Sequence, residues 1–378
     1  MAGERRTTAT ATARDLTSTL IGDRAGGWDL AGELPVAVLR ELGRQGALCA
    51  QVPVEFGGLG LSSADNGELT AHTGGLCSSV RSVQTSQGMA AWSIGRFGDP
   101  DQRRHYLPRL TGGQLAAVAF SEADAGSDLG AMTTRIEIVD GEAVVTGEKV
   151  WTTAATYADL ILVVGRFGSG AAVAVVPRDR PGVRLTRVPH PSGCRAAGHA
   201  DVRLDAVRLP ASAILGGGGH DLSMLVTAML LYGRMSVAWG CVGILRECLR
   251  VSATHVRARS QFGTELARHQ LVSRHLAELL VAEQVASRAC EHASRCWDDG
   301  DPGLVAAVVL AKQVSSRNAA RGAATAVQLL ASRAAHDGSP VARAYRDAKL
   351  MEIIEGTTEI CQLILADHAL ATAGRADA

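Results

Sequence analysis

The feature that most restricts the fold is a stripe of apolar residues between 224 and 249, spaced alternately by four and three positions. The stripe consists of Met224, Ala228, Leu231, Met235, Ala238, Val242, Leu245 and Leu249. This a/d pattern predicts one long helix that buries the stripe against neighbouring helices. A second stripe, broken only by Glu283, consists of Val272, Leu276, Leu279, Ala286, Cys290 and Ala293. Asp301-Pro302 predicts the start of a third long helix toward Leu330, so the C-terminal part is expected to be a helix bundle.

The hydrophobic period changes in the middle of the chain. Residues 15–115 have helical patterning with short, glycine-marked turns, and Asp99 with Pro100 predicts a capped helix start. From about 116 short alternating runs follow, and Asp140-Gly141 between two of them predicts a hairpin. Gly216–Gly219 is expected to be a linker. The predicted fold is α+β: an N-terminal all-α domain at 1–115, a middle antiparallel, barrel-like β domain at 116–219, and a four-helix-bundle domain at 220–378.

Composition limits the kind of partner and the compartment. The 378-residue chain has 38 basic and 38 acidic residues, which gives no basic field for nucleic acid and no polybasic membrane signal. It has no apolar run near 18 residues, and its eight cysteines show no C-x-x-C spacing. We therefore expect a cytoplasmic protein without membrane contact. The chain also lacks metal-spaced histidines, a Walker A loop, H-E-x-x-H and G-x-S-x-G, so we predict no metal site and no triad hydrolase.

Glu355 stands at a predicted joint between two helices. Gly356 can adopt the left-handed conformation that ends a helix through 345–352, and Thr357 or Thr358 can cap the next one. A carboxylate at such a joint can be aimed into a cavity. The alternative interpretation is an ordinary acidic face formed by Glu352, Glu355 and Glu359, and the local sequence leaves both open.

Six segments resemble, in order and separation, the signatures of the acyl-CoA dehydrogenase family of flavoproteins. They are 53–60, 98–110, 120–128, 147–154, 259–270 and 346–360. The resemblance covers residues 35 to 370. It implies FAD as cofactor, a helix–sheet–helix fold, and a homo-oligomer in which a neighbouring subunit completes the FAD site.

The resemblance also implies roles for single residues. Ser121 takes the position at the flavin pyrimidine side, Ser127 that at the pyrophosphate, and Trp151 that beside the ring, while the Thr153 hydroxyl reaches N5. The remaining candidates for cofactor binding are Arg259, Gln261, Phe262, Gln270, Gln328, Thr357 and Glu359. The chain departs from the family pattern after Gln328, where 329–334 replaces a glycine-rich turn.

Glu355 matches the family's catalytic base, which removes the α proton of an acyl thioester while the β hydrogen leaves as hydride. Some members carry the base just ahead of an arginine that matches Arg234, but Gly233 occupies that position here. Arg234 and Gly356 are the substrate-binding candidates. An electron-transferring flavoprotein is the candidate electron acceptor.

A narrower resemblance lies in segments 77–83, 85–92, 191–201 and 237–245. These are similar to acyl-carrier-protein dehydrogenases of methoxymalonyl extender-unit pathways in polyketide biosynthesis. That similarity implies an acyl carrier protein (ACP) as partner and a three-carbon, glycerate-derived thioester as substrate. Trp92 and Trp239 would shorten the acyl cavity, although core packing also explains each of them. Two alternatives remain open: a short-chain acyl-CoA dehydrogenase, and a non-catalytic flavoprotein or helical scaffold.

Overall fold

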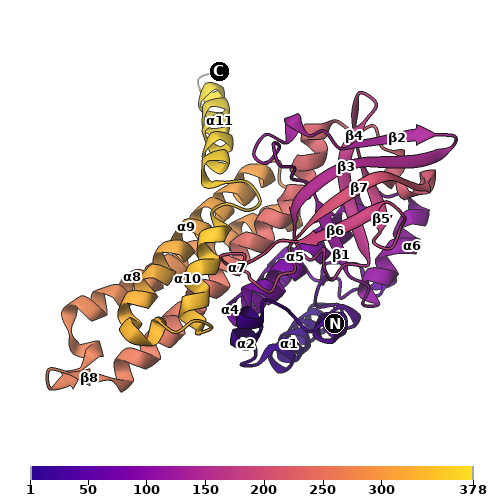
Figure 1. Ribbon diagram of the computed structural model, residues 1–378. Coiled ribbons are helices and arrows are strands. Elements are labelled where there is room, and N and C mark those ends of the chain that lie inside the picture. Colours follow the sequence, from indigo (N-terminus) through magenta and orange to yellow (C-terminus); the bar gives the residue numbers. More distant parts are fainter. Residues whose placement is uncertain (1, 377–378) are drawn as a thin grey trace.

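The computed structural model describes residues 2–376, and the side chains of 9–373. The chain runs from helices through a sheet to a second set of helices, as predicted (Figure 1). The N-terminal helices are α1 (Ala2–Ile21), α2 (Ala25–Ala31), α3 (Val36–Arg44), α4 (Ser63–Leu76), α5 (Ser78–Phe97) and α6 (Pro100–Thr111). The short 3-10 helix η1 (Val54–Phe56) interrupts the loop between α3 and α4. Asp99 caps α6 with a complete capping box, which confirms that helix start.

Helix α5 lies at the centre of the molecule and contacts α4, α6, α7 and the first strand. Nearly every residue of α5 is buried, so its polar side chains must find partners inside the protein. Gln87, for example, donates to the Gln114 carbonyl at 2.7 Å and accepts from the Ala116 N–H at 2.7 Å. These two bonds attach the first strand to α5.

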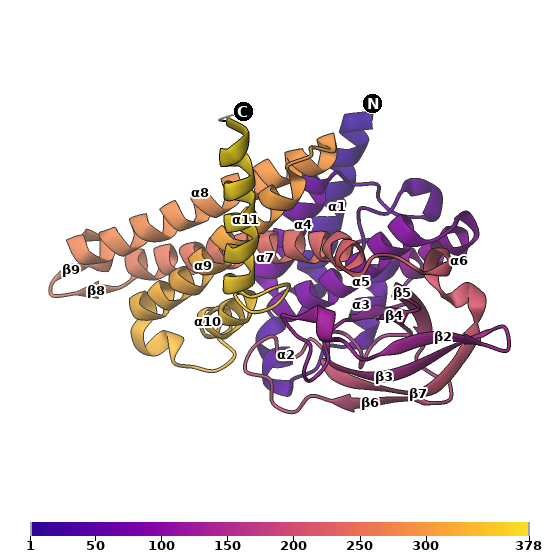
Figure 2. The same cartoon turned by 90° about the horizontal axis from the view of Figure 1, so that it is seen from above.

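The middle region is a seven-stranded sheet beside α5 (Figures 1 and 2). Its strands are β1 (Ala116–Ala119), β2 (Arg135–Val139), β3 (Glu142–Thr152), β4 (Leu160–Phe167), β5 (Gly170–Pro177), β6 (Val183–Arg187) and β7 (Ala200–Pro210). Asp140 and Gly141, with φ of 54° and 81°, form the predicted hairpin between β2 and β3. Most pairs are antiparallel, as expected. However, β1 and β2 both pair with β4 in parallel, so the sheet is mixed.

The C-terminal region contains α7 (Leu222–Ala258), α8 (Gln270–Asp299), α9 (Leu304–Leu330), α10 (Pro340–Met351) and α11 (Thr358–Ala376). Residues of both predicted stripes pack in one hydrophobic core. Glu283, the polar break, accepts from Arg246 at 3.0 Å and from Ser287 at 2.8 Å. Helix α9 begins at Leu304 and not at Pro302, because the Asp301 carboxylate instead accepts from the Gly303 N–H.

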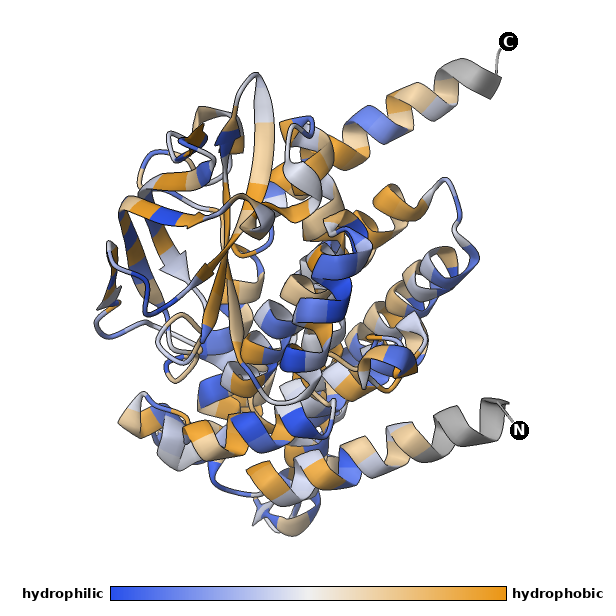
Figure 3. Ribbon diagram, turned by 90° about the vertical axis from the view of Figure 1, so that its right-hand side faces the viewer, coloured by the Kyte–Doolittle hydropathy of each residue, from blue (hydrophilic) through white to orange (hydrophobic). Residues whose placement is uncertain are grey.

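Two projections extend from the body. Helices α7 and α8 reach outward to a small hairpin of β8 (Ser260–Gln261) and β9 (Thr264–Glu265), and α11 stands clear of the bundle (Figures 1 and 3). Apolar side chains are exposed on α11, with Leu370 at 75% exposure. Helix α7 is long and apolar enough to cross a membrane, but 89% of its most apolar window is buried inside the protein.

Candidate active site

The turn between α10 and α11 places Glu355 at a helix joint, as predicted. Helix α10 ends at Met351, and the Thr358 N–H closes the turn by donating to the Glu352 carbonyl at 2.9 Å. Thr357 caps α11, because its hydroxyl accepts from the Ile360 N–H at 3.3 Å. Glu355 and Gly356 both have positive φ, 57° and 92°. A glutamate in this conformation is strained, which indicates that its environment fixes it.

The three carboxylates of this segment do not share one face. Glu352 pairs with Lys349 at 3.0 Å, and Glu359 is exposed. In contrast, Glu355 Oε2 is buried without a hydrogen-bond partner in the described part of the chain. The acidic-face interpretation is therefore wrong for Glu355.

Gly233 on α7 makes room for the Glu355 carboxylate. A Cβ at position 233 would lie 2.0 Å from Glu355 Oε2 and 2.4 Å from the Met89 side chain. Burial raises the pKa of Glu355 to about 7, against the opposing effect of Arg234, Lys312 and Arg81. A carboxylate with a free oxygen and a pKa near neutrality is suited to act as a general base.

Two buried cations hold the backbone of this turn. Arg234 Nε donates to the Glu355 carbonyl at 3.1 Å, and Lys312 Nζ donates to the Gly356 carbonyl at 2.5 Å. The Glu355 N–H itself donates to no group among the described residues, so it is available to an incoming acceptor. Sequence reasoning missed Lys312. The signal was a lysine within the apolar pattern of α9 in a chain that contains only two others, Lys149 and Lys349.

A buried ion pair joins the two β-domain segments. Lys149 Nζ donates to Glu122 Oε1 at 2.8 Å and to the Phe120 carbonyl at 2.9 Å. The Val150 N–H donates to the Ser121 carbonyl at 2.8 Å. Burial opposes ionisation of Glu122, but the hydrogen bonds from Lys149, Thr134 and Thr133 lower its pKa to about 2. This anchor brings Ser121 next to the end of β3, whereas Ser127 lies exposed on the loop beyond it.

The end of β3 presents a flat ring and a hydroxyl. A β-bulge between Lys149 and Thr152 shifts the register, and Trp151 there has a φ of 54° and an indole side chain 54% exposed. Thr153 Oγ1 lies 3.2 Å from His199 Nδ1, and the Ser86 hydroxyl donates to the Thr153 carbonyl at 3.3 Å. An exposed indole beside a fixed hydroxyl fits the side of a planar ring system such as a flavin.

The remaining cofactor candidates are not brought to this place within one chain. Arg259, Gln261, Phe262 and Gln270 lie at the outer end of α7 and α8, on the opposite side of the molecule from the sheet (Figure 1). All four are exposed, and Phe262 is 96% exposed. Gln328 is also exposed, near the end of α9. Thr357 caps α11 and Glu359 follows it, so these two lie beside Glu355.

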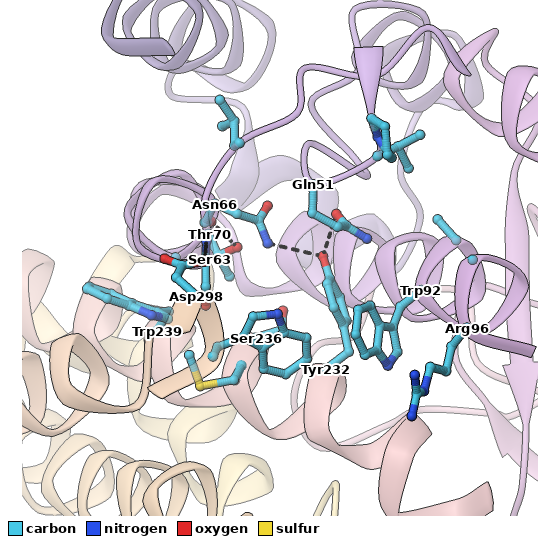
Figure 4. A pocket seen from close by; sticks show the side chains of 18 of the residues that line it. Gln51, Ser63, Asn66, Thr70, Trp92, Arg96, Tyr232, Ser236, Trp239 and Asp298 are labelled. Atoms are coloured by element: carbon cyan, nitrogen blue, oxygen red, sulfur yellow. Dashed lines mark hydrogen bonds between the residues drawn. The ribbon is translucent and has the colours of Figure 1, made fainter. Parts of the chain in front are cut away.

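A cavity of about 420 Å³ lies where α4, α5, α7 and the end of α8 meet (Figure 4). Trp92 and Trp239 both line it, and their indole N–H groups donate to the Ala228 carbonyl at 2.8 Å and the Ser294 hydroxyl at 3.1 Å. Ser236 lines it as well, whereas Gly233, Met89 and Glu355 do not. Among the described residues no group of three or more His, Cys, Asp or Glu side chains could hold a metal ion.

Comparison with known proteins identifies the class. Residues 4–114, 117–207 and 223–370 match the N-terminal, middle and C-terminal domains of acyl-CoA dehydrogenase. A probable acyl-CoA dehydrogenase of Bacillus subtilis, YngJ, is 30% identical over 90% of this chain and 92% of its own. The chain belongs to the acyl-CoA dehydrogenase family and is an FAD-dependent oxidoreductase that acts on acyl thioesters.

Two solved structures are similar to this chain over nearly its whole length. One is FkbI, described as serving biosynthesis of the methoxymalonyl extender unit of the FK520 polyketide immunosuppressant. It is 59% identical, with a TM-score of 0.91 over 95% of this chain and 99% of its own. The other is a glutaryl-CoA dehydrogenase from Mycobacterium smegmatis in complex with FADH2. It is 25% identical, with a TM-score of 0.91 over 96% of this chain and 94% of its own.

Proposed function

We propose that this protein dehydrogenates a three-carbon, glycerate-derived acyl group carried on an acyl carrier protein, on the route to hydroxymalonyl- and methoxymalonyl-ACP. The observation that carries this proposal is the 59% identity to FkbI over nearly the whole length of both chains. The alternative is a short-chain acyl-CoA dehydrogenase, which the 30% identity to YngJ supports more weakly.

The residues at the α10–α11 turn supply the proton chemistry. The carboxylate of Glu355 takes the α proton, because its Oε2 is unengaged and its pKa lies near 7. The Glu355 N–H is free to donate to the thioester carbonyl, which stabilises the negative charge that develops there. When bound, FAD would supply the acceptor for the hydride that leaves the β carbon. In a glyceryl group both the α and the β carbon carry a hydroxyl, so the resulting enediol tautomerises to the aldehyde.

Separate sets of residues would hold the substrate and the cofactor. Arg234 and Gly356 are the substrate-binding candidates beside Glu355. Ser121, Ser127, Trp151 and Thr153 would hold FAD from the β domain. Exposed residues at the outer end of α7 and α8 and near the end of α9 would complete the FAD site of a second copy of the chain. These residues are Arg259, Gln261, Phe262, Gln270 and Gln328. The functional unit would then be a homo-oligomer in the cytoplasm that passes electrons to an electron-transferring flavoprotein.

The test is anaerobic reduction of the bound flavin by defined thioesters. Glyceryl-ACP should bleach the flavin faster than propionyl- or butyryl-CoA. The reverse order would favour the acyl-CoA alternative. No bleaching by any thioester, with flavin retained, would favour a non-catalytic flavoprotein.

A further inference from the structure

Arg81 is a buried cation that lacks an acidic partner. It lies on α5, is 1% exposed, and packs against Gly240 of α7, where a Cβ would come within 2.8 Å of its Cδ. Its guanidinium donates to the Thr85 hydroxyl at 3.1 Å and contacts the Met351 sulfur at 2.9 Å, and it forms no ion pair with any described residue. A buried charge without a counter-charge is strongly unfavourable, so a ligand that supplies acceptor oxygens would relieve it.

The position of Arg81 places that ligand between the base and the β domain. Burial is the main influence on the pKa of both Glu355 and His199, and the positive charge of Arg81 lowers the pKa of each, which shows that Arg81 lies near both. Glu355 is the proposed base, and His199 contacts the Thr153 hydroxyl on the cofactor side. Met351, which Arg81 contacts, ends the helix that leads into the Glu355 turn. Arg81 therefore lies beside the end of α10 that leads into the Glu355 turn.

Two hydroxyl groups continue the hydrogen bonding of the Arg81 guanidinium from α5 to α7. Thr85 Oγ1 lies 2.7 Å from Ser236 Oγ of α7, so Arg81, Thr85 and Ser236 form one buried hydrogen-bonded chain. Gly233, which faces the Glu355 carboxylate, and Met89, which lies beside Gly233, are one turn further along the same two helices from Ser236 and Thr85. This chain therefore lies one helical turn from the place where Gly233 faces the Glu355 carboxylate.

We infer that Arg81, with Thr85, is a subsite for an oxygen substituent on the β carbon of the acyl group, either a hydroxyl or a carboxylate. This inference rests on the proposed function, since it assumes an acyl group between Glu355 and Thr153. Arg81 would then be the residue that selects an oxygenated three-carbon unit over a plain propionyl group.

The experiment compares propionyl-, 3-hydroxypropionyl- and glyceryl-ACP as anaerobic reductants of the bound flavin in wild type, Arg81→Met and Arg81→Lys. Loss of a charged hydrogen bond predicts that Arg81→Met lowers kcat/KM about 10- to 100-fold for the two oxygenated groups. The propionyl group should change less than about threefold, and Arg81→Lys should retain part of the preference. Arg104→Met is the matched control, because Arg104 is an exposed cation of the neighbouring helix α6 and should leave the preference unchanged.

A binding measurement separates the subsite from catalysis. Hydroxymalonyl-ACP has no β hydrogen, so it cannot be dehydrogenated, and its binding is read from the perturbed flavin spectrum. Its Kd should rise about tenfold or more in Arg81→Met and in Thr85→Val. An equal loss on all three acyl groups, or loss of FAD from Arg81→Met, would overturn the inference and assign Arg81 to the base or the cofactor. Failure of every thioester to reduce the wild-type flavin would instead reject the proposed function, while hydroxymalonyl-ACP binding would still report on the subsite.

Discussion

At the scale of single residues, Glu355 combines three unfavourable features. Its backbone is left-handed, one carboxylate oxygen lacks a hydrogen bond, and burial shifts its pKa upward. Arg234 and Lys312 maintain the arrangement by binding the adjacent carbonyl groups. Such features are usually found together where a side chain is held ready for a reaction.

We predict that activity follows the ionisation of Glu355. Because the base acts as carboxylate and its pKa is about 7, kcat/KM should rise about tenfold per pH unit below 7 and level off above it. Glu355→Gln should lower kcat by about 10²- to 10⁴-fold while FAD content stays unchanged. A pH profile that is flat between 5 and 8 would contradict the assignment.

The same pKa predicts a stability effect. The pKa of the Glu355 carboxyl is 4.5 in the unfolded chain and about 7 in the folded protein. Between these two pH values the folded state therefore binds more protons than the unfolded state. Wild-type stability is therefore lost as pH rises through this window. Glu355→Gln, which cannot ionise, should be more stable than wild type by about 1–3 kcal/mol at pH 8.5, and nearly equal to it at pH 4.5. Denaturant midpoints at the two pH values, at saturating FAD, measure the difference.

Gly233 offers a steric test of the site. Gly233→Ala places a methyl group 2.0 Å from the Glu355 carboxylate, so the carboxylate must move. We expect a loss of about 10²-fold in kcat and of about 1–3 kcal/mol in stability. Gly95→Ala is the matched control, since Gly95 lies in helix α5 with no atom within 4 Å of the new Cβ. If both variants behave alike, the close contact at Gly233 is not important.

At the scale of elements, sequence patterns predicted those helices, turns and caps that depend on interactions between residues close in the chain. The stripes of α7 and α8, the Asp140-Gly141 hairpin and the Asp99 cap each depend on residues close in sequence, and the structure contains them. The parallel pairing of β1 with β4 joins residues about 44 positions apart, and no pattern in either strand specifies it. For the same reason the sequence did not indicate that Lys312 contacts Gly356, or that Gly233 faces Glu355.

The end of α9 contains a strained residue that can be tested. Ala331 has φ 50° and ψ −128°, a region that glycine adopts far more easily than other residues. Ala331 lies in the segment where the family has its glycine-rich turn. We predict that Ala331→Gly stabilises the protein by about 1 kcal/mol, seen as a higher Tm. Ala335→Gly, at a helical φ of −76° nearby, should instead destabilise it slightly.

At the scale of the whole molecule, the two halves of the proposed FAD site lie at opposite ends of one chain. Trp151 and Thr153 lie at the sheet, whereas Arg259 and Phe262 lie at the end of the arm formed by α7 and α8 (Figure 1). Phe262 contacts only the edge of the His269 ring among the described aromatic side chains, and an aromatic side chain that is 96% exposed is unusual for a surface without a partner. A symmetric dimer that brings each arm to the partner's sheet would bury it.

Complementation between two inactive variants tests this arrangement. Glu355→Gln removes the base, and Arg259→Glu disables the arm, so each variant alone should be inactive. In a mixed dimer, one of the two sites combines an intact Glu355 with an intact arm from the other chain. Refolding an equal mixture should therefore restore activity in about a quarter of all sites, because half of the dimers are mixed. If each arm serves its own chain, no activity returns. As a control, Glu355→Gln mixed with Gly233→Ala should give about half the activity of Gly233→Ala alone, because Gly233 and Glu355 meet within one chain and mixing creates no intact site.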